Sequence, residues 1–379
     1  MNKKIMIIAG EASGDLHGSG LVRAISARQP DVEFIGIGGD KMRAAGVELL
    51  YHINDMSVLG FWDVLRRLRF FRKVYRQMIA TMNLQRPALL ILIDYPGLNL
   101  KLAAAARERS IKVFYYIAPQ VWAWGASRIP KMARLIDRMA VILPFEEAMF
   151  RQAGIAADFV GHPLLETVIS RMDRKDFFQK NGLDVGKKTI GLLPGSRPLE
   201  VKRLLPEMLE IVRRLQQKYP QIQTIIGKAS SLTGEIYAPF LTADHQAKLL
   251  DNCTYEVMQH SDLLLVASGT ATLESALFAT PMIIAYKVDP LSYIIARSLV
   301  KIDAIGLVNV IAGHKIVPEF IQHEFRWQNV LPEAETLLFD HNRRQSVITD
   351  LKNIKTKLGQ PGASARAATL ALDLMDSVS

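Results

Sequence analysis

Short apolar runs, each followed by a segment with helical spacing, recur along most of this chain. We predict strands at 4–9, 32–37, 88–93, 113–117, 139–143, 190–193, 224–226, 247–250, 263–266 and 282–285. Because these short runs alternate with helical segments, the pattern favours parallel, doubly wound sheets in an α/β protein. The pattern pauses near Gly161, His162 and Pro163 and then resumes, so we place a hinge there. A chain of 379 residues suits two domains of ordinary size.

Charge and cysteine content narrow the classes of function. The formal net charge is +10, which favours phosphate-bearing partners: nucleic acid, anionic lipid or a phosphorylated substrate. The chain has no helix-turn-helix, zinc-finger spacing or aromatic RNA-binding motif, which argues against nucleic acid. Cys253 is the single cysteine, so neither a disulfide framework nor a cysteine metal site is expected. No run approaches the roughly 18 apolar residues of a membrane span, and the first is too short for a signal peptide, so we expect a soluble or peripheral protein.

The turn after the run at 190–193 has the composition of an anion site. Gly195 breaks the strand, Ser196 can cap the following helix, and Pro198 suits the first turn of that helix. Backbone N–H groups, a hydroxyl and the guanidinium of Arg197 would then face one point, which suits a phosphate or pyrophosphate. The alternative is an ordinary strand-to-helix turn with a surface arginine.

A second turn of this kind follows the run at 263–266. Small residues at 267–271 let a ligand approach the backbone closely. Glu274 falls in the first turns of the next predicted helix, where a carboxylate can accept hydrogen bonds from two ribose hydroxyls. Two such turns in one half of the chain indicate a nucleotide diphosphate that lies along the strand ends.

Six motifs in the same order along the chain resemble those of the lipid-A-disaccharide synthases. They are GEASGD at 10–15, PQVWAW at 119–124, VGHP at 160–163, GSRxxE at 195–200, SGTATLE at 268–274 and NVIAG at 309–313. Each motif alone is weak, but the ordered set covers most of the chain and is specific. The resemblance implies an inverting glycosyltransferase of the GT-B type, with two Rossmann-like doubly wound domains that face a cleft.

The resemblance also implies how the chain is divided between those domains. The first domain, 1–163, would receive the acceptor and face the membrane. C-terminal helices from about 342 to 379 would return to complete this domain. The second domain, 164–341, would bind the UDP-sugar.

The implied reaction joins UDP-2,3-diacylglucosamine to 2,3-diacylglucosamine 1-phosphate. The products are the β(1→6) lipid A disaccharide 1-phosphate and UDP, in lipopolysaccharide biosynthesis. GT-B enzymes of this type need no bound metal or cofactor, and no Asp-x-Asp pair follows a predicted strand here. Three alternatives stay open: a UDP-N-acetylglucosamine 2-epimerase, the transferase that builds the peptidoglycan lipid intermediate, and a non-catalytic membrane-surface protein with a nucleotide-binding fold.

Three residues are candidates for the base that takes the proton of the acceptor hydroxyl. Asp94 directly follows the run at 88–93 and is the first choice, with an N-cap of the next helix as its alternative role. Glu11 and His17, in the first predicted loop, are the other two candidates, and Glu11 can instead orient the acceptor. The family usually carries a second acid where this chain has Gly97. That departure places more of the burden on Asp94 or signals altered handling of the acceptor.

The substrate-binding residues are expected from the two turns and from the resemblance. Arg197 is the favoured diphosphate contact because its fork of donors matches phosphate oxygens, and N–H groups near Gly269 add positive potential. Trp122 and Trp124 are either a sugar platform or buried aromatics. The full set comprises Ser13, Asp15, Gly195, Ser196, Arg197, Glu200, Ser268, Gly269, Thr270, Ala271, Thr272, Glu274, Asn309, Glu319 and Gln322.

The segment 61–76 combines bulky apolar residues with a dense basic charge. A helix of this composition is suited to a membrane interface, with Phe61, Trp62, Leu65, Leu68 and Phe71 as the inserted face. The alternative is that the apolar face belongs to the core and the arginines to a solvated surface. We therefore expect a cytoplasmic protein on the inner membrane, whose partners are the UDP-sugar, the acylated acceptor and, as a further option, a second copy of the chain.

Overall fold

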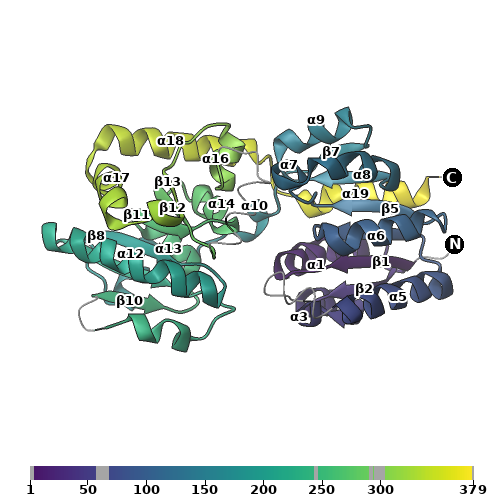
Figure 1. Cartoon of the computed structure of the whole chain (residues 1–379), viewed down its shortest axis with the longest axis horizontal. Coiled ribbons are helices and arrows are strands. Elements are labelled where there is room, and N and C mark those ends of the chain that lie inside the picture. Colours follow the sequence, from purple (N-terminus) through teal and green to yellow (C-terminus); the bar gives the residue numbers. More distant parts are fainter. Residues whose placement is uncertain (1–3, 57–67, 243–245, 290–292, 294–303, 378–379) are drawn as a thin grey trace. The chain divides into compact units, whose positions relative to one another are not determined.

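The computed structural model describes residues 4–56, 68–242, 246–289, 293 and 304–377. The chain forms two compact units, one made of 1–163 and 358–379, the other of 164–357. Each unit contains a parallel sheet between layers of helices (Figure 1). Two parallel-sheet α/β domains are the fold class that the alternating pattern predicts.

In the first unit, seven described strands form a parallel sheet in the order β3-β2-β1-β4-β5-β6-β7. The strands are β1 (Lys4–Ala9), β2 (Glu33–Gly38), β3 (Val47–His52), β4 (Leu89–Ile93), β5 (Lys112–Tyr116), β6 (Arg138–Val141) and β7 (Ala157–Phe159). The central strands β1 and β4 are almost wholly buried, which explains why they are continuous apolar runs and lack the alternation of a half-exposed strand.

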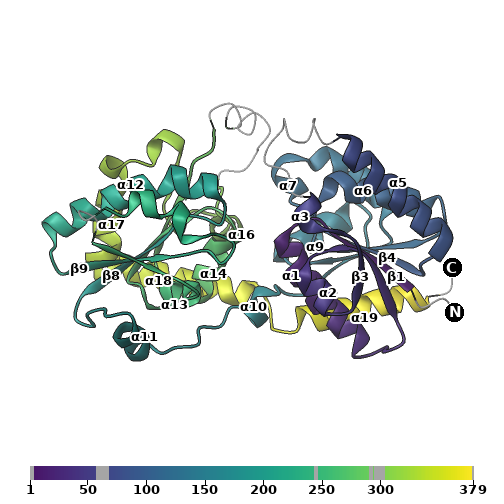
Figure 2. The same ribbon diagram turned by 90° about the horizontal axis from the view of Figure 1, so that it is seen from below.

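Helices cover both faces of this first sheet. They are α1 (Ala12–Ser26), α2 (Asp40–Ala44), α3 (Ile53–Met56), α5 (Leu68–Gln85), α6 (Pro96–Arg107), α7 (Val121–Trp124), η1 (Ala126–Arg128), α8 (Ile129–Leu135), α9 (Pro144–Gln152) and α19 (Ala363–Asp376). Figure 2 shows α5 and α6 on one face of the sheet and α1 and α19 on the other.

The second unit repeats the plan with six described strands in the order β10-β9-β8-β11-β12-β13. Its strands are β8 (Lys188–Leu193), β9 (Ile222–Gly227), β10 (Ala247–Leu250), β11 (Leu263–Ala267), β12 (Met282–Tyr286) and β13 (Glu319–Ile321). Its helices are α10 (Leu164–Thr167), α11 (Arg174–Lys180), α12 (Pro198–Lys218), η2 (Gly234–Ile236), η3 (Ala238–Phe240), α13 (Thr254–His260), α14 (Thr270–Leu277), α16 (Leu307–Ala312), η4 (Gln322–Glu324), α17 (Trp327–Phe339) and α18 (His341–Lys357).

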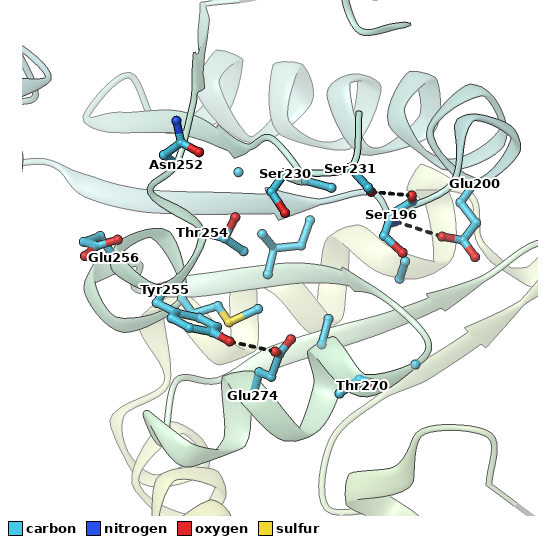
Figure 3. Close-up of a pocket in the computed structure, with 18 of the residues that line it drawn as sticks. Ser196, Glu200, Ser230, Ser231, Asn252, Thr254, Tyr255, Glu256, Thr270 and Glu274 are labelled. Carbon is cyan, nitrogen blue, oxygen red and sulfur yellow. Dashed lines mark hydrogen bonds between the residues drawn. The ribbon is translucent and has the colours of Figure 1, made fainter. Parts of the chain in front are cut away.

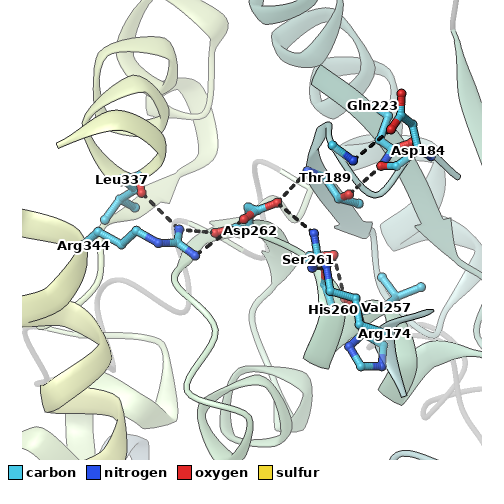
Figure 4. Close-up of polar contacts among 11 residues, drawn as sticks. Arg174, Asp184, Thr189, Gln223, Val257, His260, Ser261, Asp262, Leu337 and Arg344 are labelled. Atoms are coloured by element: carbon cyan, nitrogen blue, oxygen red, sulfur yellow. Dashed lines mark hydrogen bonds and ion pairs between the residues drawn. The ribbon is translucent and has the colours of Figure 1, made fainter. Parts of the chain in front are cut away.

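The C-terminal segment returns to the first unit later than the sequence suggested. Its return begins at Leu358, not near 342, because α18 packs on α14, α16 and α17 of the second unit. Polar contacts fasten α18 there as well: the Arg344 guanidinium donates to the Asp262 carbonyl at 2.5 Å, and the Asp262 carboxylate accepts from the N–H of Thr189 at 2.8 Å (Figure 4). Only α19 therefore completes the first unit, against α1, β5 and β6.

Arg366 in α19 ties together the two stretches of chain that lead from the first unit to the second and back. Its guanidinium donates to the carbonyl of Val160 at 2.9 Å, just before the outgoing crossing. It also donates to the carbonyls of Gln360 at 2.5 Å and Pro361 at 2.9 Å, just after the returning one. The Arg366 guanidinium thus holds the ends of both connecting segments on the first unit.

Each sheet has one topological switch point, where the order of the strands reverses. It lies between β1 and β4 in the first unit and between β8 and β11 in the second. Ligands of doubly wound proteins bind beyond the carboxyl ends of the strands at such points. The residues after β1 and β4, and those after β8 and β11, are therefore the places to look for a site.

The described part of the 61–76 segment divides between core and surface. Phe71 packs partly buried against the core of the first unit, together with Val74, Met78 and Met82 of α5, as the core alternative predicted. Leu68 stays 42% exposed. Phe61, Trp62 and Leu65 lie outside the described residues. No helix in the described ranges is both long enough and apolar enough to span a bilayer.

Candidate functional site

A pocket of about 840 Å³ lies at the switch point of the second unit. It is lined by the turn after β8, the turn after β11, and loops after β9 and β10 (Figure 3). Nine residues expected from the sequence line it: Gly195, Ser196, Arg197, Glu200, Ser268, Gly269, Thr270, Ala271 and Glu274. The pocket belongs entirely to the second unit.

Glu200 organises the turn after β8. Its Oε2 accepts hydrogen bonds from the N–H groups of Ser196 at 3.0 Å and Arg197 at 3.3 Å. The helix begins at Pro198 with Arg197 as the N-cap residue, so the prediction that Ser196 caps it was wrong. Gly195 has φ +115°, and a Cβ there would collide with Glu200. Two of the expected backbone donors are thus occupied by Glu200, which leaves the Arg197 side chain as the main cation of this turn.

The Arg197 guanidinium lies 3.5 Å from Glu200 Oε1, and its side chain is two-thirds exposed. An exposed ion pair of this kind contributes little to folding, about 0–1 kcal/mol. Arg197 therefore loses little if it turns from Glu200 to an anion in the pocket. Figure 3 places Ser196 and Glu200 together at one end of the pocket.

The turn after β11 leads into α14, whose N-terminus borders the pocket. Gly269 has φ +146°, and no neighbouring atom lies within 4 Å of the position of a Cβ, so the turn is open. The hydroxyl of Thr272 donates back to the Gly269 carbonyl at 2.8 Å. Thr272 is fully buried and does not line the pocket, so it supports the turn and is no ligand contact. The partial positive charge of the α14 N-terminus favours an anion beside this turn.

Glu274 and Tyr255 meet on one side of the pocket. The Tyr255 hydroxyl donates to Glu274 Oε1 at 3.1 Å. Burial raises the pKa of Glu274, and the hydrogen bond from Tyr255 opposes this rise. The Tyr255 side chain, with those of Ser230, Ser231, Asn252 and Thr254, lines the pocket without having been expected. The signal was present, since these residues lie within five positions of the ends of the predicted strands at 224–226 and 247–250.

Asn309, Glu319 and Gln322 do not line this pocket. The Asn309 side chain is buried, donates to Glu319 Oε1 at 2.8 Å and accepts from the N–H of Ile316 at 2.9 Å. Glu319 also accepts from the N–H of Gly306 at 2.8 Å, and Gln322 bonds to the backbone of Val288. Asn309 and Glu319 therefore fasten α16 to β13, and Gln322 fastens η4 to the segment after β12. The substrate-binding role of these three residues is not supported by the geometry.

Asp94 and Tyr95 follow β4 at the switch point of the first unit. Both have left-handed backbone angles, φ 43° and 47°. Such conformations cost about 1–3 kcal/mol each and gather at functional sites. The Asp94 carbonyl accepts from Tyr115 Oη at 2.5 Å and Asn99 Nδ2 at 2.7 Å, which holds the turn. The N-cap residue of α6 is Tyr95, so Asp94 does not have the capping role considered for it.

The Asp94 carboxyl has an unusual acidity. Burial, and secondly the negative charge of Glu11, raise its pKa to about 6, while the N–H of Tyr95 opposes this rise. Glu11 follows the neighbouring strand β1 and is exposed. A Cβ at Gly10 would collide with the Tyr95 ring, so the glycine lets the two strand ends approach. Asp94 and Glu11 thus form a pair of carboxylates at this switch point.

Asp15 and His17 have surroundings different from those expected. The buried Asp15 carboxylate accepts from the N–H groups of Gly39 at 2.7 Å, Met42 at 2.9 Å and Lys41 at 3.1 Å. It caps α2, so its place among the substrate contacts is not supported. Burial lowers the pKa of His17 to about 4, which makes the imidazole a weak base. Ser13 is exposed in the first turn of α1.

Glu146 is a buried acid of the first unit that the sequence reasoning missed. Its Oε1 accepts from Trp122 Nε1 at 3.0 Å, and its Oε2 accepts from the N–H of Leu143 at 3.2 Å. Burial raises its pKa to about 8, and the charge of Asp94 adds to the rise. Trp122 is thus a half-buried, hydrogen-bonded aromatic, whereas Trp124 is 42% exposed with the Arg128 guanidinium 4.6 Å from its ring. Among the described residues no cluster of His, Cys, Asp or Glu could hold a metal ion.

Comparison with known proteins identifies the family. Residues 5–373 match the sequence profile of the family described as Lipid-A-disaccharide synthetase. The lipid-A-disaccharide synthase of Syntrophus aciditrophicus is 44% identical over 378 residues, covering 99% of both chains. That of Geobacter metallireducens is 43% identical over 375 residues, covering 99% of this chain and 98% of the relative.

The chain belongs to the lipid-A-disaccharide synthase family. It is therefore a glycosyltransferase of lipid A biosynthesis.

Solved structures show the same fold at much lower sequence identity. Staphylococcus aureus MnaA, in a co-structure with UDP, superposes with a TM-score of 0.65 at 16% identity and covers 100% of this chain and 99% of its own. The UDP-GlcNAc 2-epimerase of Neisseria meningitidis, bound to UDP-GlcNAc, gives 0.62 at 15% identity, covering 98% and 100%. The chain shares its two-domain α/β fold with these two proteins.

Proposed function

We propose that this enzyme transfers the 2,3-diacylglucosaminyl group from UDP-2,3-diacylglucosamine to 2,3-diacylglucosamine 1-phosphate. The 6-hydroxyl oxygen of the acceptor attacks C1 of the donor sugar from the face opposite the diphosphate. The bond from C1 to the phosphate oxygen breaks, UDP leaves, and the hydroxyl proton passes to a base of the protein. The observation that carries this proposal is the pocket of the second unit, where a cation, a helix N-terminus and a carboxylate line one cavity.

The donor nucleotide would lie along that pocket. Arg197 would contact the diphosphate, where its charge offsets the negative charge that grows on the leaving group. The N–H groups at Thr270 and Ala271 add the field of the α14 N-terminus. Glu274 would accept hydrogen bonds from the ribose hydroxyls.

Asp94 is the base that the geometry favours. A carboxyl with a pKa of about 6 is mostly ionised at neutral pH yet is a stronger base than an ordinary aspartate. The strained turn and the two hydrogen bonds to the Asp94 carbonyl fix the backbone from which this side chain projects. Glu11 and His17 are the alternatives, but Glu11 is exposed and His17 has a pKa near 4. With no acid at Gly97, Asp94 is the single acid of the turn after β4 and of α6.

The deciding experiment measures UDP release from the two lipid substrates in the presence of EDTA. We expect release that requires the acceptor and yields the disaccharide 1-phosphate by mass spectrometry. UDP release without acceptor, or conversion of UDP-N-acetylglucosamine to its 2-epimer, would contradict the proposal. Full dependence on added Mg²⁺ would contradict the metal-free mechanism.

We also propose that the enzyme meets its acylated substrates at the surface of the inner membrane. Each buried CH₂ contributes about 0.8 kcal/mol, so complete extraction of several acyl chains into water is prohibitive. The described part of the basic segment offers exposed Arg69, Arg72, Lys73 and Arg76 beside exposed Leu68. Each of these four cations can contribute roughly 1 kcal/mol near an anionic surface.

The test of membrane binding compares two double charge reversals. Arg72→Glu with Arg76→Glu should release the protein from anionic vesicles by at least about tenfold while UDP affinity stays unchanged. Lys352→Glu with Lys355→Glu, on the exposed face of α18, is the matched control and should sediment with vesicles as wild type does. Equal sedimentation of both variants would place the docking surface elsewhere.

A further inference from the structure

Tyr255 reaches the pocket of the second unit from α13, an element that none of the recognised motifs includes. It is the second residue of that helix, and its ring lies 6.2 Å from the ring of Phe278. Its hydroxyl ends 3.1 Å from Glu274 Oε1 (Figure 3). The tyrosine therefore bridges two helices, and its polar end points at the Glu274 carboxylate.

The two oxygens of Glu274 have different surroundings. Oε1 accepts from Tyr255, whereas Oε2 accepts no hydrogen bond from the residues that the structure describes. Glu274 lines the pocket, so a hydroxyl of a bound molecule can reach Oε2. The second acid nearby, Glu256, is buried, and its Oε1 already accepts from the N–H of Arg171 at 2.9 Å. On this side of the pocket, the half-buried Glu274 is thus the more accessible of the two carboxylates.

We propose that Tyr255 positions Glu274 for the ribose of the donor nucleotide, and that this pair sets the preference for a ribonucleotide. The inference rests on the proposed function, in which UDP occupies the pocket of the second unit. Tyr255 is a positioning residue, since its hydroxyl acts on the ribose through Glu274.

The physical reason is the conformational entropy lost when the Glu274 side chain is fixed in one rotamer. A glutamate side chain has three rotatable bonds, and fixing one rotamer costs conformational entropy. A hydrogen bond from Tyr255 selects the rotamer before the nucleotide arrives, so less order is lost on binding. The same bond favours the ionised carboxylate, which is the form that accepts hydrogen bonds from hydroxyls.

The experiment compares UDP with 2′,3′-dideoxy-UDP by calorimetry on the full chain. Wild type should prefer UDP. Tyr255→Phe keeps the ring against Phe278 and removes only the hydroxyl, so UDP affinity should fall about tenfold while dideoxy-UDP affinity changes little. Glu274→Gln should weaken the preference similarly, and adding Tyr255→Phe to it should cause little further loss. Tyr219→Phe, far from the pocket lining on the end of α12, is the matched control and should behave as wild type.

The outcomes separate the inference from the proposed function. If Tyr255→Phe weakens both nucleotides equally, or leaves the UDP preference intact, the hydroxyl does not act through the ribose and the inference is wrong. Tyr255→Leu removes the ring as well as the hydroxyl. If it weakens the binding of both nucleotides while Tyr255→Phe weakens neither, the ring and not the hydroxyl matters, and the inference is again wrong. If wild type binds neither nucleotide, the proposed donor site falls, and the inference falls with it.

Discussion

The pair formed by Asp94 and Glu11 allows a sharp prediction about the pH dependence of transfer. A base must be ionised to accept a proton, so kcat/KM should rise with pH through the pKa of Asp94, about 6. With that pKa, Asp94 is ionised in roughly nine-tenths of molecules at pH 7 and in about one-tenth at pH 5. We therefore expect kcat/KM at pH 5 to be about a tenth of its value at pH 7.

Glu11→Gln then shifts this acidic limb in a known direction. The negative charge of Glu11 is the second cause of the raised pKa of Asp94, so its removal moves the limb to lower pH. Burial, the largest cause, remains, so the limb should stay above the ordinary value of 3.8. The ratio of kcat/KM at pH 5 to that at pH 7 should rise in this variant.

The assay is UDP release with both lipid substrates from about pH 4.5 to 8, on wild type, Glu11→Gln and Asp94→Asn. The acceptor phosphate itself titrates near pH 6, but that titration belongs to the substrate and cannot move in Glu11→Gln. Asp94→Asn should lose about 10²–10⁴-fold in activity. An acidic limb that is identical in wild type and Glu11→Gln, or an Asp94→Asn variant within a few-fold of wild type, would refute the assignment of Asp94 as base.

Three further predictions concern binding and stability. Arg197→Ala should weaken UDP binding by about 1.5–3 kcal/mol in calorimetry, whereas Arg203→Ala on the same helix should not; an unchanged dissociation constant would place the diphosphate elsewhere. Asp15→Ala should lower the free energy of unfolding in urea by about 3 kcal/mol or more, because three buried N–H groups lose their acceptor; a loss below about 1 kcal/mol would contradict the cap. Burial lowers the pKa of His162 to about 3, so its contribution to stability is complete above pH 6.5 and is lost as pH falls. Wild type should therefore lose about 2–3 kcal/mol more than His162→Gln between pH 7 and 4.5 in urea titrations, and parallel losses would refute this.

The sequence could predict the central strands and the two turns of the second unit. Ile190 and Leu264 lie in strands whose two faces are both buried, so a continuous hydrophobic run is enough to identify these strands. Three edge strands were missed: β7 and β13 have only three residues each, and β3, though six residues long, is mostly half-buried. Their residues mix polar and apolar types without a clear period.

The sequence indicated residue types suited to a site, but not which hydrogen-bond partner each side chain has. Asn309 and Asp15 have the chemistry of ligand contacts, yet both direct their hydrogen bonds to partners within their own unit. A sequence cannot say which acceptor meets which donor across 24 or more residues, as with Asp15 and Gly39. Tyr255 and Glu146 were missed for the same reason, since their roles come from partners on other elements.

The placement of α19 has a consequence for how the protein is made. The second unit is one continuous stretch of chain, so it can fold once its own residues have left the ribosome. The first unit is synthesised mostly earlier, but it lacks the helix that covers α1, β5 and β6 until the final segment appears. Through that interval the apolar surface that Ala367, Ala368 and Ala371 bury in the finished protein is uncovered. The second unit can therefore be completed before the first, although most of the first is translated earlier, and a released chain that ends before Leu358 has every residue of the second unit but lacks α19 of the first.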